Sequence, residues 1–224
     1  MTTLKTLRAS TALCFIAALS ACNSATPAAN MTAPATTPAT MVATSGMTPT
    51  AATTNNFVTA FDASNTQLAT TTPMTGTANY TGEVEVHTTT SRTDPDNVVY
   101  GDLAMDVNFG GAASPITATV SNIEGRIGGV DTKVTGTLSS VGSSGINQVV
   151  ALPVLGTTAT SIAVRADGAL ADPTGTLTGN AQMTFAGTVR GTNGASITGS
   201  NSVVITETGG ANKFNTGGRF YADR

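Results

Sequence analysis

The chain has 224 residues, of which 10% are charged and 4% aromatic, with 24 glycines, no tryptophan and a formal net charge of −3. A helical bundle needs outer faces rich in Lys and Glu, so this composition favours Thr- and Val-rich strands joined by glycine-containing turns. The weak negative charge, without a basic stripe interleaved with aromatic residues, argues against nucleic acid as a partner.

Residues 1–21 have the pattern of an export signal. Lys5 and Arg8 precede a mostly apolar run that starts near Ala9. About a dozen apolar residues are too few for a helix that crosses a bilayer, which needs about 20. The run ends in "LSAC" at residues 19–22. This tetrapeptide resembles the bacterial lipobox, which implies cleavage between Ala21 and Cys22 after the Cys22 thiol has been acylated.

Acylation would attach the mature protein to membrane lipid through Cys22. Two or more acyl chains make such an anchor stable, because each buried CH₂ group contributes about 0.8 kcal/mol. The alternative is a cysteine that happens to lie near an ordinary cleavage site, as Cys14 lies within the apolar run. The residue after Cys22 is Asn23, and not the aspartate that resembles the inner-membrane retention signal of enteric bacteria. We therefore expect the outer membrane. The sequence leaves open whether the protein faces the periplasm or the cell surface. Both cysteines precede residue 23, so the remaining chain holds no disulfide and no thiolate metal site.

Residues 22–55 are a low-complexity Ala/Thr/Pro segment without a helical or strand period. Such a segment buries too little apolar surface to offset the entropy of ordering it, and it predicts a disordered tether of roughly 30 Å. The folded domain is expected over residues 56–224. At its start, the spacing of Phe57, Phe61 and Leu68 predicts a short helix or extended cap that packs onto the domain.

Eight segments between residues 76 and 223 alternate apolar and polar side chains with the period of two that is typical of half-buried strands. Turn residues separate the segments. They are NYTGEVEV (79–86), DLAMDVNF (102–109), ITATVS (116–121), KVTGTLS (133–139), SIAVRADG (161–168), AQMTFAGTV (181–189), SITGSNSVVI (196–205) and GRFYAD (218–223).

Antiparallel strands with one apolar face must close into a barrel or pack as a sandwich. Glycines on the apolar face favour a small barrel, whose strands bend sharply at such positions: Gly82, Gly136, Gly187 and Gly199. Inner faces of Met, Phe, Val and Leu predict a filled interior. A transmembrane barrel needs an outward apolar band with aromatic girdles. The outward positions here are polar, so we predict an all-β, eight-stranded, antiparallel soluble β-barrel.

Three glycine-based motifs mark the two ends of this module. They are "GTANYTG" (76–82), "DVNFGG" (106–111) and "TGGRFYADR" (216–224). In order and spacing they resemble the β-barrel domain of the transferrin-binding protein B family of surface lipoproteins, and the resemblance covers residues 56–224. It implies an eight-stranded barrel on an outer-membrane lipid anchor that binds an iron carrier or another protein. Members with two lobes have a handle domain beside each barrel, whereas this chain has a single barrel and no handle. None of the family's ligand-contacting loops matches this sequence, so only the fold carries over directly.

Two polar motifs contain residue types that can serve catalysis or metal binding. His87 is the only histidine and shares the outward parity of Glu83 and Glu85, which predicts a solvated surface position rather than a catalytic or haem-ligating one. "TDPDN" (93–97) clusters two carboxylates, as a Ca²⁺ loop does. Pro95 between them and the missing bidentate Glu predict a turn instead.

The three tyrosines do not form an iron-binding pattern. Tyr80 has inward parity, whereas Tyr100 and Tyr221 fall on the wet face or near a rim. We therefore expect no enzymatic activity, no catalytic residue, no metal and no cofactor.

A filled barrel leaves binding to its loops, and the longest predicted loop is residues 139–157. It carries five apolar residues that would form a partner-binding patch if exposed together: Val149, Val150, Leu152, Val154 and Leu155. The alternative is that this segment folds back and caps the barrel end.

These features predict an outer-membrane lipoprotein that acts as a non-enzymatic binding module and captures an iron carrier or another protein or nutrient through its loops. Its expected partners are membrane lipid, through acylated Cys22, and a protein ligand or a TonB-dependent receptor. The alternative is a structural envelope or coat lipoprotein without a discrete ligand.

Overall fold

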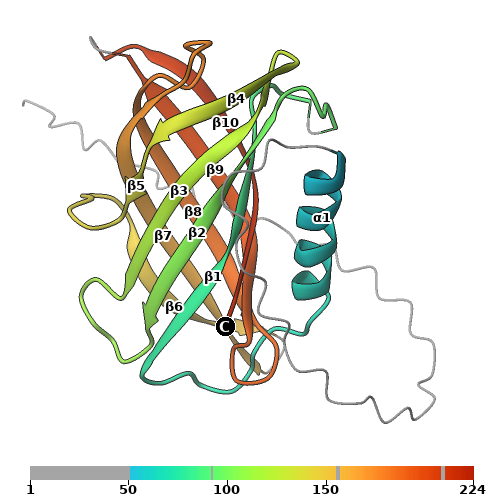
Figure 1. Ribbon diagram of the computed structural model, residues 1–224. Helices are drawn as coiled ribbons and strands as arrows, with labels where there is room; N and C mark the ends of the chain where they lie inside the picture. Colours follow the sequence, from blue (N-terminus) through green and yellow to red (C-terminus); the bar gives the residue numbers. More distant parts are fainter. Residues whose placement is uncertain (1–50, 92, 155–156, 208–209) are drawn as a thin grey trace, which may run out of the picture. The chain divides into compact units, whose positions relative to one another are not determined.

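The computed structural model describes residues 51–91, 93–154, 157–207 and 210–224 (Figure 1). The predicted signal peptide, the acylation site and most of the tether lie outside these residues. The elements are α1 (Ala51–Asn65), β1 (Thr77–His87), β2 (Val98–Asn108), β3 (Ile116–Ile127), β4 (Val130–Gly136), β5 (Leu138–Ser139), β6 (Asn147–Val154), β7 (Thr157–Ala171), β8 (Gly179–Arg190), β9 (Ser196–Thr206) and β10 (Asn212–Asp223).

The strands form a closed antiparallel barrel with eight strand positions. Around the barrel the order is β2-β1-β10-β9-β8-β7-β4-β3, and pairing between β2 and β3 closes the sheet. Strands β4 and β5 share one position, because each pairs with β3 on one side and with β7 on the other. The predicted eight-stranded barrel is confirmed.

Gly136 marks the break between β4 and β5. Its φ of +115° is a backbone conformation that residues with a Cβ rarely adopt. A Cβ at this position would also lie 2.2 Å from the carbonyl oxygen of Ala169 on β7. The strand bends here at a glycine, as the sequence predicts.

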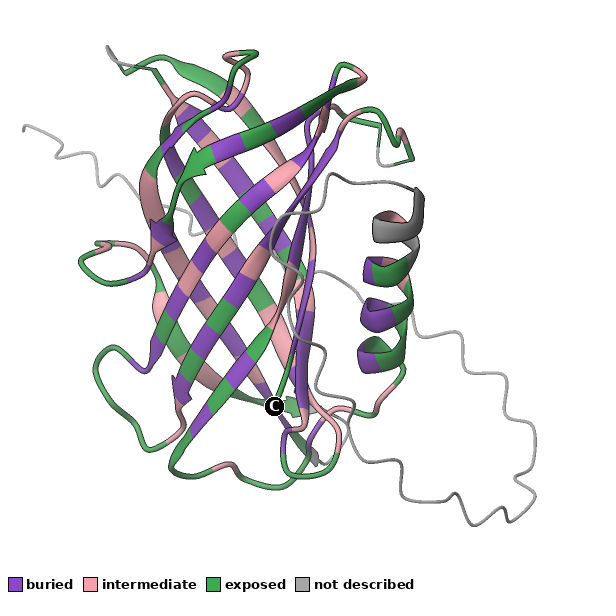
Figure 2. Ribbon diagram, in the orientation of Figure 1, coloured by how far each residue is buried: buried purple, intermediate pink, exposed green. Residues whose placement is uncertain are grey.

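Inward-facing side chains fill the barrel, and all eight predicted segments contribute to its core. Phe185 and Phe220 meet in the interior with ring centroids 5.1 Å apart and planes at 84°, an edge-to-face arrangement. Buried and exposed positions alternate along the strands (Figure 2). Buried members of the core include Tyr80, Val84, Leu103, Met105, Ile116, Val120, Val134, Leu138, Ile162, Val164, Met183, Ile197, Ile205 and Ala222.

Helix α1 packs against the outside of the barrel. Phe57 is fully buried and Phe61 nearly so, in a second apolar cluster with Val98, Tyr100 and Tyr221. The predicted helix is confirmed, and it begins five residues earlier than residue 56, inside the range expected to be tether.

Leu68 was predicted to share the apolar face of this helix, and this prediction is wrong. The helix ends at Asn65, so Leu68 falls outside it and its side chain is 87% exposed. None of the described helices is long and apolar enough to cross a membrane.

Candidate functional site

A hollow of about 450 Å³ lies at one end of the barrel, where the β2–β3 loop meets β6 and β7. The segment between α1 and β1 completes its wall with Pro73 and Met74. The other lining residues are Asn108, Phe109, Gly111, Ala112, Ala113, Pro115, Asn147, Gln148, Val149, Ala151, Thr158 and Thr160.

The described lining of the hollow is mostly apolar and carries no charged side chain. Met74, Phe109 and Val149 supply apolar surface, and the amides of Asn147 and Gln148 supply hydrogen-bonding groups. A concave, mainly apolar hollow of a few hundred Å³ with a few polar groups is typical of a ligand pocket, and the mouth of a β-barrel is a common place for one. The described lining side chains can contribute apolar contacts and hydrogen bonds to a ligand.

Much of the predicted loop 139–157 is a strand, so the expectation of a long binding loop is wrong. Residues of β6 pair with β7 from Asn147 opposite Val164 to Val154 opposite Thr157. β6 and β7 are thus consecutive antiparallel strands and form a hairpin. The hairpin arises because alternate residues of β6 can face the barrel interior, where Val149 packs against the core.

The side chain of Asn147 joins β6 to β3. Its Nδ2 donates to the carbonyl oxygen of Ile116 at 2.7 Å, and its Oδ1 accepts from the Ile116 backbone N–H at 2.9 Å. These two bonds give the first residue of β3 the pairing that a neighbouring strand would supply. Beyond Asn147, β6 continues past the start of β3 and forms one wall of the hollow.

Of the three predicted binding residues whose side chains the structure describes, one lines the hollow. Val149 does so, whereas Val150 is half-buried and Leu152 is exposed on the other face of β6. The Val154 side chain and Leu155 lie outside the described residues.

Sequence reasoning missed Asn147, Met74 and the two threonines of β7, Thr158 and Thr160. The alternation of Asn147, Val149 and Ala151 with Gln148, Val150 and Leu152 is a strand pattern. Pro153 and the apolar character of both faces concealed it.

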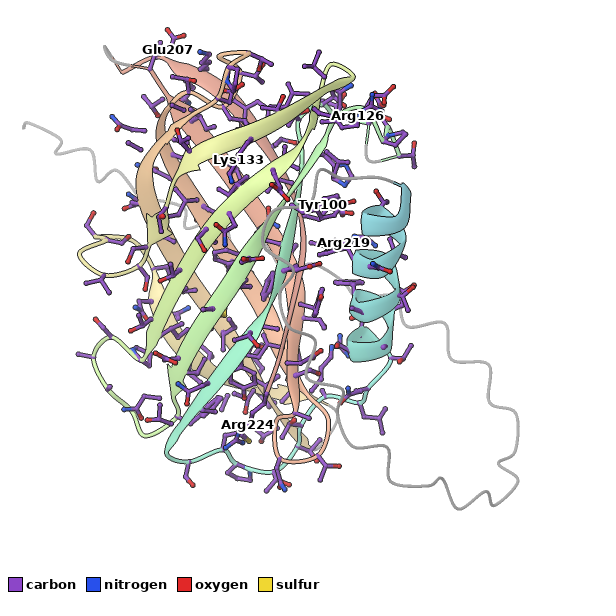
Figure 3. The ribbon with its side chains drawn as sticks, in the orientation of Figure 1. Tyr100, Arg126, Lys133, Glu207, Arg219 and Arg224 are labelled. Atoms are coloured by element: carbon purple, nitrogen blue, oxygen red, sulfur yellow. The ribbon has the colours of Figure 1, made fainter. Side chains whose placement is uncertain are left out.

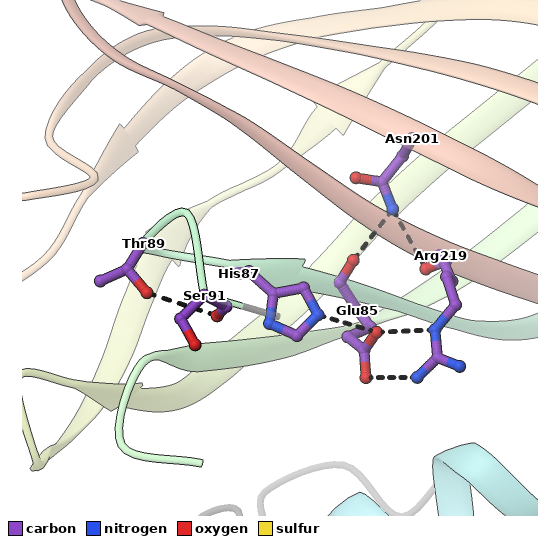
Figure 4. A network of polar contacts seen from close by, with 6 residues as sticks. All are labelled: Glu85, His87, Thr89, Ser91, Asn201 and Arg219. Carbon is purple, nitrogen blue, oxygen red and sulfur yellow. Dashed lines mark hydrogen bonds and ion pairs between the residues drawn. The ribbon is translucent and has the colours of Figure 1, made fainter. Parts of the chain in front are cut away.

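A buried polar network lies on the outer wall of the barrel, facing α1 (Figure 3). Arg219 donates to both carboxylate oxygens of Glu85, with distances of 3.0 Å and 3.1 Å. The Nε2 atom of His87 lies 3.1 Å from Glu85 Oε1 (Figure 4). The Arg219 guanidinium also lies over the rings of Phe61 and Phe57, 4.9 Å and 5.7 Å from their centroids. This network holds α1 on the barrel wall.

Asn201 completes the network from the inner side of the same wall. Its Nδ2 donates to the backbone oxygens of Glu85 at 2.9 Å and Arg219 at 3.1 Å. These bonds bridge β1 and β10 just past their paired stretch, which ends at Val84 opposite Phe220. A Cβ on Gly218 would lie 1.9 Å from the Glu85 oxygen, so glycine is needed where the two strands approach.

Burial and hydrogen bonding act in opposite directions on these groups. Burial raises the pKa of Glu85, but hydrogen bonds from His87 and Arg219 outweigh burial and hold that pKa below its usual value. Burial raises the pKa of Tyr100 to about 12. Burial, helped by the nearby carboxylate of Glu83, also raises the pKa of Tyr221.

The predicted solvated positions of His87, Tyr100 and Tyr221 are wrong. Their outward parity is correct, but α1 or the network covers that face of the barrel, and the three residues are only 5%, 5% and 6% exposed. The cluster is aromatic and its charges are paired within the wall, so it fastens the helix and offers no open site.

The turn predicted at residues 93–97 is present between β1 and β2. Asp94 accepts hydrogen bonds from the Asp96 backbone N–H at 3.0 Å and from Asn97 Nδ2 at 2.8 Å. Across the part of the chain that the structure describes, no group of three His, Cys, Asp or Glu residues is placed to hold a metal ion.

Comparison with family models, with curated proteins and with solved structures finds no match to this chain. The resemblance of its terminal motifs to transferrin-binding protein B barrels therefore stays a prediction.

Proposed function

We propose that this chain is a lipid-anchored, non-enzymatic binding module of the bacterial outer membrane, and that the hollow at the barrel end receives its ligand. One observation carries the proposal: an otherwise filled barrel has an uncharged, mainly apolar hollow of about 450 Å³ at its end. A ligand of matching character would be uncharged and small, or would be an uncharged part of a larger partner. Such a partner could be an iron carrier or another protein, as the resemblance implies, or a TonB-dependent receptor.

Filling the hollow tests the binding role. In Val149→Trp the indole would occupy the space that Val149 lines, whereas Val130→Trp places the same ring at a position that is 58% exposed. Each variant and the wild type are produced in the bacterium that naturally makes the protein and are isolated from its membranes. Bound species are then detected by native mass spectrometry and by cross-linking. We expect a bound species with the wild type and Val130→Trp, and its loss with Val149→Trp. Absence of any bound species from the wild type, or equal binding by all three, would favour the coat lipoprotein.

The anchor has its own test. Cys22→Ser should abolish incorporation of radiolabelled fatty acid and release the protein from membranes, whereas Cys14→Ser should retain both. Label that persists in Cys22→Ser contradicts the anchor. Protease treatment of intact cells then distinguishes the cell-surface face, where the barrel is cleaved or shed, from the periplasmic face, where it survives.

A further inference from the structure

Strand β6 has one paired edge and one unpaired edge. Among the described strands β6 pairs with β7 alone, and the hydrogen bonds that join it to β3 come from the Asn147 side chain at its start. The hollow touches both faces of β6, since it is lined by inward-facing Val149 and by Gln148 on the opposite face. Residues of both faces can line one hollow when the hollow lies along the edge of the strand.

The register shows which backbone groups point to this free edge. The backbone N–H of Arg165 on β7 donates to the Ile146 oxygen at 2.8 Å, next to the first residue of β6. Hydrogen-bonding direction alternates along an antiparallel strand, so Gln148, Val150 and Leu152 direct their N–H and C=O groups to β7. The groups of Val149 and Ala151 therefore point away from β7, toward the hollow.

Pro153 agrees with this assignment. It follows the same alternation as Val149 and Ala151, and a proline is tolerated in a strand where its missing N–H would face away from the ladder. Pairing along the free edge is thus limited by Asn147, whose side chain is bound to β3, and by Pro153, which has no donor.

We propose that the ligand of the hollow is an extended, uncharged polypeptide segment that adds as a strand to the free edge of β6. This inference rests on the proposed function and specifies its ligand class. The edge requires a partner with alternating N–H and C=O groups, which an extended backbone provides. The described lining has no charge to pair with a charged side chain, and burying an unpaired charge there would be costly. Alternate side chains of the added strand would enter the hollow beside Met74 and Phe109.

Ala151→Pro is the decisive variant. It removes one donor from the free edge and repeats the arrangement of Pro153 two residues away, so β6 keeps its bonds to β7. Leu152→Ala is the control, because it shortens a side chain on the opposite face and leaves every backbone N–H in place. Retained thermal unfolding temperature and circular dichroism spectrum of both variants establish that the barrel is intact.

The probe is a phage-displayed library of dodecapeptides built only from Ala, Ser, Thr, Val, Asn and Met, selected against the complete barrel protein. We expect enriched peptides whose affinity falls about fivefold or more in Ala151→Pro, the loss of about one hydrogen bond, and is unchanged in Leu152→Ala. Every second amide of the peptide can be N-methylated in either of two phases. The phase that removes the N–H groups directed at β6 should abolish binding, and the other phase should spare it. On binding, the amides of Val149 and Ala151 should become protected from hydrogen exchange.

Several results would overturn the inference. They are the absence of enriched peptides, equal binding by Ala151→Pro, insensitivity to the phase of N-methylation, and amides of Val149 and Ala151 that are already protected in the free protein. If Ala151→Pro instead abolishes concentration-dependent dimers of the wild type, a second copy of the chain occupies the edge. A bound species lost only in Val149→Trp would preserve the proposed function even when strand addition fails.

Discussion

Arg219 binds Glu85 with two nitrogen atoms, at 3.0 Å and 3.1 Å, across the seam where β10 meets β1. The two residues are 134 positions apart in the chain. Their ion pair therefore joins the first strand of the barrel to the last, and the same guanidinium lies against two phenylalanine rings of α1. One side chain thus connects barrel closure to attachment of the helix.

Glu85→Gln should destabilise the protein most near neutral pH. Because the folded-state pKa of Glu85 lies below its unfolded value, its stabilising effect is complete above the unfolded pKa and is lost as the pH falls through the folded pKa. Unfolding of the variant should cost about 1–3 kcal/mol less at pH 7, with the difference shrinking below about pH 4. Urea titrations from pH 3 to 8 measure it. Glu207→Gln, at an exposed carboxylate, should follow the wild-type profile.

Phe57→Ala should loosen α1. The side chain is fully buried and contacts the rings of Phe61, Tyr100 and Tyr221 at centroid distances of 6.1, 5.4 and 5.5 Å. Its truncation should reduce the free energy of unfolding by about 3–5 kcal/mol, with faster hydrogen exchange in α1 and slow exchange kept in the barrel. Leu68→Ala, at an exposed position, should change stability by about 0.5 kcal/mol or less. Equal effects of both changes would contradict the packing of α1.

Asn147→Ala should open the junction between β6 and β3. The variant loses both hydrogen bonds to the Ile116 backbone, which should cost about 1–3 kcal/mol. Faster exchange of the Ile116 amide, followed by nuclear magnetic resonance, reports the opening directly. Asn79→Ala on the exposed face of β1 removes an amide of the same size and should leave the Ile116 amide protected.

The tyrosines should remain un-ionised at pH 10 in the folded protein. Burial is the main cause that raises the pKa of Tyr80, Tyr100 and Tyr221, for Tyr100 to about 12. Absorbance at the phenolate wavelength should therefore stay low through pH 10 in the native state and rise there in denaturant. A phenolate step at pH 10 that disappears in Tyr100→Phe would show that α1 does not shield this ring.

Sequence alternation predicted the barrel well because parity along a strand specifies which side chains face the interior. Leu103, Met105 and Phe185 are buried for this reason. Parity does not specify what covers the outer face, so Glu85, His87 and Tyr100 were expected in solvent although α1 and the network cover them. The spacing of Phe57 and Phe61 indicated a helix, but it did not indicate which strands the helix would cover.

The hollow was less predictable because it depends on long-range register. Val149 and Phe109 come from segments that meet only once β6 extends past the start of β3. The local sequence of β6 also contains a proline, which is tolerated only because one edge of that strand is unpaired. The unpaired edge of β6 is a property of the folded barrel, so the local sequence does not reveal it.

Helix α1 begins near the barrel end that bears the β1–β2 turn and runs toward the end that bears the hollow (Figure 1). The N-terminal end of α1 therefore lies at the end of the barrel opposite the hollow. If Cys22 carries a lipid anchor, the anchored segment and the ligand therefore use opposite ends of the domain and do not compete for the same surface.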